Sequence, residues 1–233
     1  IQTSIILGVM VFVFILALRL FKMSPELSMI LSAFVGALVA GFGLPLRHIV
    51  EGAFTYLDII LVIISATIFM NVLKDSGAIF SIVRSMVVNF YKHRFILLIL
   101  LMLVLLLPGA LTGAGSVSVL ISGGIVAMVL VSMGISLINV TAIVFIGAAL
   151  SVVAPPVNIY AMIISGGVNM PYIGFFVPLT IPILILAIFS VIFLGWQGKP
   201  LELNEILKKL PKVPSKMTGF RVYIPFIVLV CLM

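Results

Sequence analysis

The chain has 233 residues, of which 64% are hydrophobic and only 8% charged, and its mean hydropathy is +1.47. A soluble domain is roughly half apolar and about a quarter charged, so six acids and thirteen Lys/Arg cannot cover the surface of a soluble fold this long. Lipid is therefore the expected solvent for most of the surface. The net charge of +7 lies in short loops between apolar runs, a juxtamembrane pattern that does not indicate nucleic acid. Cys231 is the only cysteine, which excludes an internal disulfide.

Apolar runs follow one another along the chain, separated by short polar, glycine-containing or proline-containing segments. They cover residues 1–18, 27–44, 53–73, 78–91, 95–107, 125–133, 140–164 and 173–196. We therefore expect an all-α integral membrane protein with about six transmembrane helices. The 78–91 run carries Arg84 and is expected to be a tilted or interfacial arm. The 95–107 run is almost pure Leu, Ile and Met and is expected to face lipid.

Capping residues predict where some of these helices begin and end. Ser24-Pro25-Glu26 predicts a helix start, with Ser24 as the cap and Pro25 in the first helical position. Pro45 is expected to end the same helix, whose glycines and alanines predict close packing against other helices. Gly134-Ile135-Ser136 predicts a turn between two later helices.

Residues 108–124, PGALTGAGSVSVLISGG, differ from the apolar runs on either side. Five glycines and four hydroxyl side chains predict non-helical backbone at membrane depth, which is tolerated only inside protein or beside a wet cavity. We expect Thr112, Ser116 and Ser118 to supply hydroxyl ligands in this segment. Gly113 and Gly115 would let the backbone turn and approach a ligand.

A second interruption, Ala154-Pro155-Pro156-Val157-Asn158, is predicted to break the helix over 140–164. Pro155 and Pro156 have no backbone N–H, so carbonyls near Ser151 lose their helical partners. Asn158 adds an amide that can both donate and accept hydrogen bonds. Broken helices of this kind form the substrate and ion sites of secondary transporters. The alternative for each interruption is a glycine packing contact or a simple proline kink.

The ligands expected at both interruptions are neutral dipoles and hard oxygens. They suit Na⁺ and a carboxylate better than a transition metal. We expect Na⁺ ligands at Gly113, Ser116 and Asn158, with Na⁺ as the coupling ion and no other cofactor. No phosphate-cradling motif is present, so ATP-driven transport by this chain is not expected.

Three further polar residues are candidate functional groups. Asp58 lies near the start of its apolar run, which favours an interfacial helix N-terminus over an intramembrane proton or cation site. His48 and His93 each lie beside an arginine in a short loop, without a partner at metal-ligand or triad spacing. No enzyme activity is therefore expected.

The runs divide the chain into four parts. These are the helices at 1–56, the remaining spans with the first interruption (108–124) and the broken helix (140–164) at 57–196, a basic amphipathic arm at 197–218, and the start of a further transmembrane helix at 219–233. The five lysines of the arm predict a cytoplasmic location for it.

The hairpin segment PGALTGAGSVSVLISGGIVAMVLVSMGIS, followed by AAL…APPVNIYAMII, resembles the large permease subunit of tripartite ATP-independent periplasmic (TRAP) transporters. More broadly it resembles the ion-transporter superfamily that includes divalent-anion/sodium symporters. The resemblance covers residues 57–196 and implies the N-terminal inverted-repeat half of an elevator-type transporter. It also implies a re-entrant hairpin at 108–124, scaffold helices at 1–56 and a connecting role for the arm at 197–218. The family's hairpin tip and broken-helix loop correspond to Thr112, Gly113, Gly115, Ser116, Pro155, Pro156 and Asn158. Val157-Asn158 stands here where the family commonly has serine after the two prolines.

The resemblance implies Na⁺-coupled uptake of small organic anions, C4-dicarboxylates or similar carboxylates, across the prokaryotic inner membrane by a multi-pass protein. Besides membrane lipid, the implied partners are a small membrane subunit, a periplasmic substrate-binding protein, and a second repeat half or another copy of the chain. The alternative is a channel-like or purely structural subunit of a larger transport complex. A channel would need a filter built by subunit symmetry, which nothing in the sequence indicates.

Overall fold

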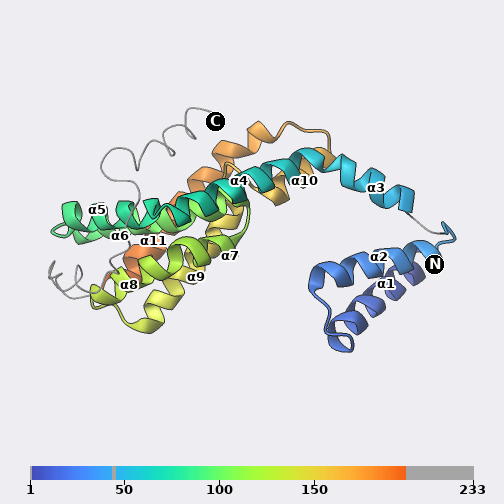
Figure 1. The fold of residues 1–233 in the computed structure, drawn as a ribbon, viewed down its shortest axis with the longest axis horizontal. Helices are drawn as coiled ribbons and strands as arrows, with labels where there is room; N and C mark the ends of the chain where they lie inside the picture. The colour runs from blue at the N-terminus through green and yellow to red at the C-terminus, as the bar shows by residue number, and fades with distance from the viewer. Residues whose placement is uncertain (1, 44–45, 198–233) are drawn as a thin grey trace. The chain divides into compact units, whose positions relative to one another are not determined.

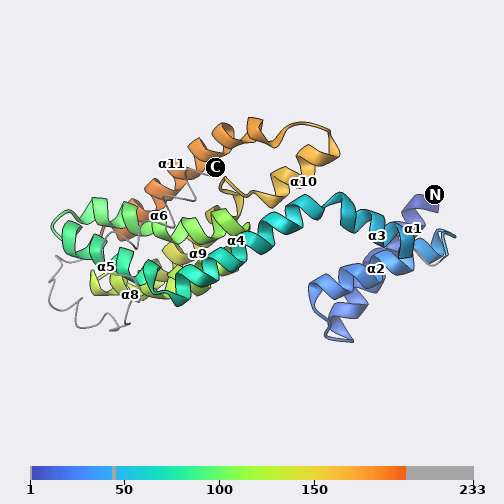
Figure 2. The ribbon, with the colours of Figure 1, turned by 45° about the horizontal axis from the view of Figure 1, so that its top comes forward.

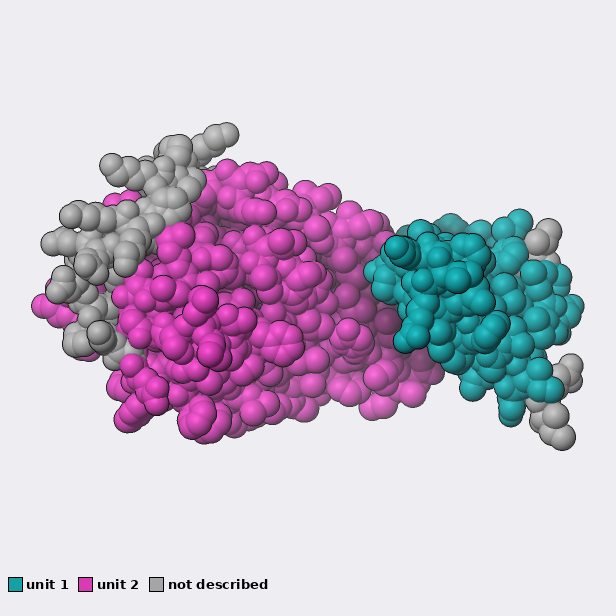
Figure 3. Space-filling model, turned by 90° about the horizontal axis from the view of Figure 1, so that it is seen from below, with its two compact units in different colours: residues 1–57 teal, residues 58–233 magenta. Residues whose placement is uncertain are grey.

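The computed structural model describes residues 2–43 and 46–197, and every regular element in these ranges is a helix. The predicted arm at 198–218, the predicted further helix at 219–233 and Pro45 lie outside the described residues. The chain divides into two compact units, Ile1–Leu57 and Asp58–Met233, coloured separately in Figure 3.

Four helical segments in the described part are long and apolar enough to cross a membrane. They are Leu57–Asp75, Arg94–Thr112, Gly115–Ser132 and Tyr172–Gly195. The prediction of an all-α membrane protein is confirmed at this coarse level. Within residues 2–43 and 46–197, four segments reach spanning length where about six were expected for the whole chain, because four other apolar helices in these ranges have only 10–17 residues.

The first unit contains α1 (Gln2–Arg19), α2 (Pro25–Val39) and α3 (Leu46–Thr55), and α1 and α2 lie side by side in Figures 1 and 2. Ser24 caps α2 as predicted, accepting a hydrogen bond from the amide of Leu27. Small residues on one face of α2 permit close packing, as expected in lipid. Ser32 Oγ donates to Met10 O at 2.8 Å, and a Cβ at Gly36 would lie 2.5 Å from Met10 Cγ.

The end of α2 differs from the prediction, because the helix stops at Val39, well before Pro45. Gly41 follows with a φ of +83°, and the amide of Phe42 donates to Ala37 O at 3.1 Å. A left-handed glycine closes the last turn of a helix in this way without a proline. Gly41 therefore serves the turn and not helix packing.

The predicted apolar run 53–73 is divided in the structure at Tyr56, between α3 and α4 (Leu57–Asp75). His48, expected in a loop, lies in α3. Asp58 lies exposed in the first turn of α4, as expected for a helix N-terminus.

The second unit begins with α4 and is built around α6. Its further elements are α5 (Ala78–Phe90), α6 (Arg94–Thr112), α7 (Gly115–Ser118), the π-helix η1 (Val119–Gly123), α8 (Gly124–Ser132), α9 (Leu137–Val153), α10 (Ile159–Gly167), the 3-10 helix η2 (Tyr172–Phe175) and α11 (Phe176–Gly195). Helices α5, α7, α8, α9 and α11 all contact α6.

Helix α6 and the continuous segment α7–η1–α8 form the two limbs of a helical hairpin and run antiparallel. Near their junction the amide of Gly109 bonds Ser118, and at the far ends Leu97 and Met133 belong to one core cluster. Gly134 makes the predicted turn into α9, with a φ of +72°.

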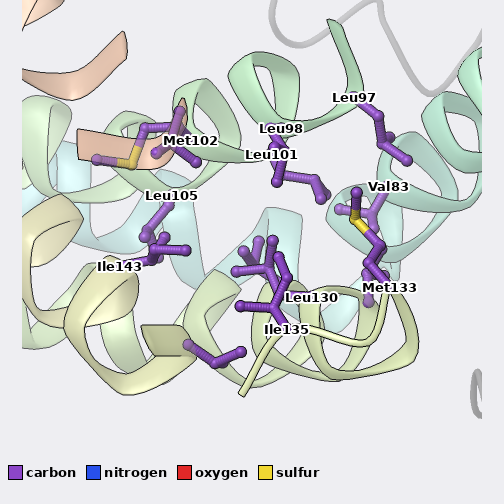
Figure 4. Packing of buried hydrophobic residues seen from close by; sticks show 14 of the residues in the cluster. Val83, Leu97, Leu98, Leu101, Met102, Leu105, Leu130, Met133, Ile135 and Ile143 are labelled. Carbon is purple, nitrogen blue, oxygen red and sulfur yellow. The ribbon is translucent and has the colours of Figure 1, made fainter. Parts of the chain in front are cut away.

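The prediction that residues 95–107 face lipid is wrong. Of the four candidate spans, α6 is the most enclosed, with 61% of its apolar stretch buried, compared with 11% for α4. Leu98, Leu101 and Leu105 are fully buried and pack with residues of α8 and α9 (Figure 4). An all-apolar helix suits lipid and protein interior equally, so its composition does not distinguish them.

Helix α5 has 13 residues, fewer than the roughly 20 that a membrane span needs. Val83 and Val87 are fully buried in the same core as α6, whereas Arg84 is exposed. The predicted arm is therefore packed along one face against the unit.

Candidate functional site

The first interruption is much shorter than predicted. Helix α6 continues through Pro108 to Thr112, and α7 begins at Gly115, so only Gly113 and Ala114 are non-helical within 108–124. Gly113 has a φ of +67°, a conformation that favours glycine, and Ala114 is extended. The rest of the segment is helical, and two of its hydroxyl groups bond to carbonyls of their own helices. Thr112 Oγ1 donates to Pro108 O at 2.8 Å and Ser122 Oγ to Ser118 O at 2.9 Å.

The second interruption lies where it was predicted. Helix α9 ends at Val153 and α10 begins at Ile159, with a cis peptide bond between Pro155 and Pro156. Asn158 joins the two helices across the break. Its Oδ1 accepts from the amide of Ala161 at 3.0 Å, and its Nδ2 donates to Val153 O at 2.9 Å. The side chain thus caps both the start of α10 and the end of α9.

The two helix breaks lie against each other. The amide of Val157 donates to Ala110 O at 2.9 Å, which links the proline break to the last turns of α6. A Cβ at Gly113 would lie 2.6 Å from Ile159 Cγ1, and a Cβ at Gly115 would lie 2.6 Å from Ala148 O. Glycine at these positions therefore allows the hairpin tip to contact both sides of the second break.

A buried hydrogen-bond chain behind the breaks joins α6, α7 and α9. The amide of Gly109 donates to Ser118 Oγ at 2.8 Å, Ser118 Oγ lies 3.1 Å from Ser151 Oγ, and Ser151 Oγ bonds Ala148 O at 2.7 Å. Both serines are fully buried. We call Gly109, Ser118 and Ser151 the serine clasp. The clasp fastens the hairpin to α9.

The structure separates the predicted site residues into two groups. Thr112, Ser118, Ser151 and Asn158 are buried and bonded to protein groups, so they hold the breaks in place. Ser116 is different, because its hydroxyl lies exposed in the first turn of α7. Among the predicted hydroxyl ligands it is the accessible one. Pro155 and Pro156 are half-buried, Gly115 is half-buried and Gly113 is buried.

Tyr172, at the start of η2, is a site residue that the sequence analysis missed. Its hydroxyl donates to Pro156 O at 3.0 Å and accepts from the amide of Asn158 at 3.2 Å. One side chain therefore satisfies an acceptor and a donor within the break. The contact joins residues 14 and 16 positions apart, and no local sequence pattern indicates it.

Metal-ligating and cavity-lining residues in the described ranges restrict the chemistry further. No group of three or more His, Cys, Asp or Glu residues is close enough there to hold a metal ion. A cavity of ≈190 Å³ lies beside the second break and is lined by Ala110, Ala154, Pro155, Thr180 and six apolar residues. Such a lining offers little to a carboxylate, so polar ligands must come from the backbone and hydroxyls at the breaks.

Comparisons with known proteins give no assignment of family or function. No protein-family model, no curated protein and no solved structure matches this chain. Function is therefore inferred from the two breaks and the groups around them.

Proposed function

We propose that this chain is one repeat half of a multi-pass secondary transporter that couples Na⁺ to the uptake of small organic anions, C4-dicarboxylates or similar carboxylates. The observation that carries this proposal is the contact between two helix breaks inside an apolar helical unit, made through Val157 and Ala110. Breaks at membrane depth are the places where transporters expose backbone donors and acceptors to solutes. In this proposal the unit moves by an elevator mechanism in the prokaryotic inner membrane.

The second break brings together the ends of two helix dipoles. The C-terminal end of α9 carries partial negative charge and the N-terminal end of α10 partial positive charge, and residues 154–158 join them. Because Pro155 and Pro156 lack N–H groups, the carbonyls of Ser151 and Val152 have no helical amide partner. These carbonyls favour a cation, whereas the first amides of α10 favour a carboxylate.

The cation ligands we propose are Gly113 O, Ser116 Oγ and Asn158 Oδ1. All three are hard oxygens of the kind that bind Na⁺. Asn158 Oδ1 accepts one hydrogen bond from Ala161 and retains a second lone pair. The serine clasp maintains the contact between the breaks. A second repeat half, a small membrane subunit and a substrate-binding protein would complete the transporter.

The test is uptake of a radiolabelled C4-dicarboxylate by cells or vesicles that contain the assembled transporter, this chain together with its second repeat half and partner subunits, with and without an inward Na⁺ gradient. Ser116→Ala is expected to reduce Na⁺-dependent uptake about tenfold or more through loss of one cation ligand, and Asn158→Ala at least as strongly. Ser132→Ala is the matched control, because Ser132 lies in the same hairpin limb and bonds only Met128 O of its own helix. Uptake by Ser116→Ala equal to that of the control would refute the ligand assignment. Ion conductance without gradient-driven uptake would favour the channel-like alternative.

A further inference from the structure

Helix α3 is amphipathic, and its apolar face is covered by none of the described residues of its own unit. Leu46, Ile49, Val50 and Phe54 recur at helical spacing on one face and are between 45% and 67% exposed. No residue of α3 is buried. A helix of 10 residues is about 15 Å long, too short to cross a membrane.

The opposite face of α3 carries an exposed ionic cluster. Arg47 Nε lies 2.7 Å from Glu51 Oε1, and His48 Nδ1 lies 3.6 Å from Glu51 Oε2. The side chain of Arg47 is 86% exposed. Charged groups this exposed must be solvated by water or by lipid headgroups, and the long side chain of Arg47 can reach both from the polar face.

The following helix indicates where α3 lies relative to a bilayer. Helix α4 has 19 residues, and at about 1.5 Å per residue its length matches the roughly 30 Å hydrocarbon core. Asp58 lies in its first turn, while Lys74 and Asp75 end it, so charged groups mark both ends of the span. Tyr56 alone joins Thr55 to Leu57, a distance of a few ångströms. The C-terminal end of α3 is therefore at the level where α4 enters the membrane.

We infer that α3 is an interfacial helix that lies in the headgroup–acyl boundary of the bilayer. Its apolar face, Leu46, Ile49, Val50 and Phe54, rests on the acyl chains, and its ionic face, Arg47, His48 and Glu51, faces water and headgroups. Tyr56 lies at the same boundary, the usual depth of membrane tyrosines. This inference depends on α4 crossing the membrane and not on the proposed transport activity.

Tryptophan fluorescence in lipid vesicles tests the inference on the full chain. Trp196, the one native tryptophan, is first replaced by Phe, and single tryptophans are then introduced as Val50→Trp or His48→Trp. The two positions are close in the chain but lie on opposite faces of α3, and both are exposed. Phe54→Trp is a second reporter on the apolar face. Far-UV circular dichroism confirms that each variant keeps its helices.

Phosphatidylcholine brominated near the headgroup should quench Val50→Trp and Phe54→Trp at least about twofold more than it quenches His48→Trp. Lipid brominated near the chain end should quench Val50→Trp and Phe54→Trp less than lipid brominated near the headgroup does. Aqueous iodide should quench His48→Trp more strongly than it quenches the two variants on the apolar face. Equal quenching on both faces would overturn the inference. Protection of Val50→Trp from bromine and iodide alike would also overturn it, because protein, either the rest of this chain or a second copy, would then cover the apolar face.

Discussion

Replacement of Gly109 by alanine is the most direct perturbation of the serine clasp. A Cβ at this position would lie 2.6 Å from Ser151 Cβ and 2.7 Å from Ser118 Oγ, and closer still to Ser151 Oγ. Gly109→Ala must therefore displace Ser151 and break its hydrogen bond with Ser118. The contact between the hairpin and α9 would loosen at a point where both serines are fully buried.

The expected cost follows from three contributions. Overpacking a close-packed site costs about 1–3 kcal/mol. An interhelical hydrogen bond in a membrane protein contributes about 0.6 kcal/mol on average. Alanine returns up to about 1 kcal/mol of helix propensity. The net loss in the free energy of unfolding is thus about 1–3 kcal/mol.

Unfolding of the purified chain by sodium dodecyl sulfate in mixed micelles, followed by circular dichroism, measures this loss. Gly124→Ala is the matched control, because a Cβ at Gly124 meets nothing within 4 Å, and it should be neutral or slightly stabilising. Ser151→Gly removes the obstructing side chain, so the double variant should recover about 1–2 kcal/mol in a double-mutant cycle. The steric explanation is refuted if Gly109→Ala unfolds like Gly124→Ala, or if Ser151→Gly gives no recovery.

Two further substitutions test the breaks by the same unfolding assay. Tyr172→Phe keeps the ring but removes both hydrogen bonds to the second break, and it should cost about 1–2 kcal/mol, whereas the exposed Tyr160→Phe should change nothing. Equal stability of the two variants would contradict the role given to Tyr172. Gly113→Ala places a Cβ at a φ of +67° and against Ile159, and it should cost about 1–3 kcal/mol. Gly166→Ala, in open space within α10, is its control, and an equal effect would argue against strain at the hairpin tip.

The second break was predictable from the sequence because its cause is local. Two adjacent prolines remove two amide donors, and Asn158 is a standard capping residue, so residues 154–158 indicate a stop and a start within five positions. In the structure α9 ends at Val153, directly before this segment, and α10 begins at Ile159, directly after it.

The first break could not be delimited from composition, because its glycines serve different purposes. At Gly109 the missing side chain leaves room for Ser118 and Ser151, and at Gly115 it allows close contact with α9. Of the glycines in this segment, Gly113 alone has a left-handed φ. Hydroxyls that looked like free ligands instead bond carbonyls or each other, as Ser118 and Ser151 do. Such pairings depend on which helices are neighbours, and a residue pattern carries no information about that.

The central position of α6 bears on how the unit assembles. Helix α6 precedes α9 and α11 in the chain, so if the helices insert in chain order, its surface on those sides meets lipid before it meets protein. In that order α9 and α11 replace the acyl chains around it only later. A helix that must be compatible first with lipid and then with protein needs a uniformly apolar sequence. The Leu, Ile and Met residues at 95–107 meet both requirements in turn.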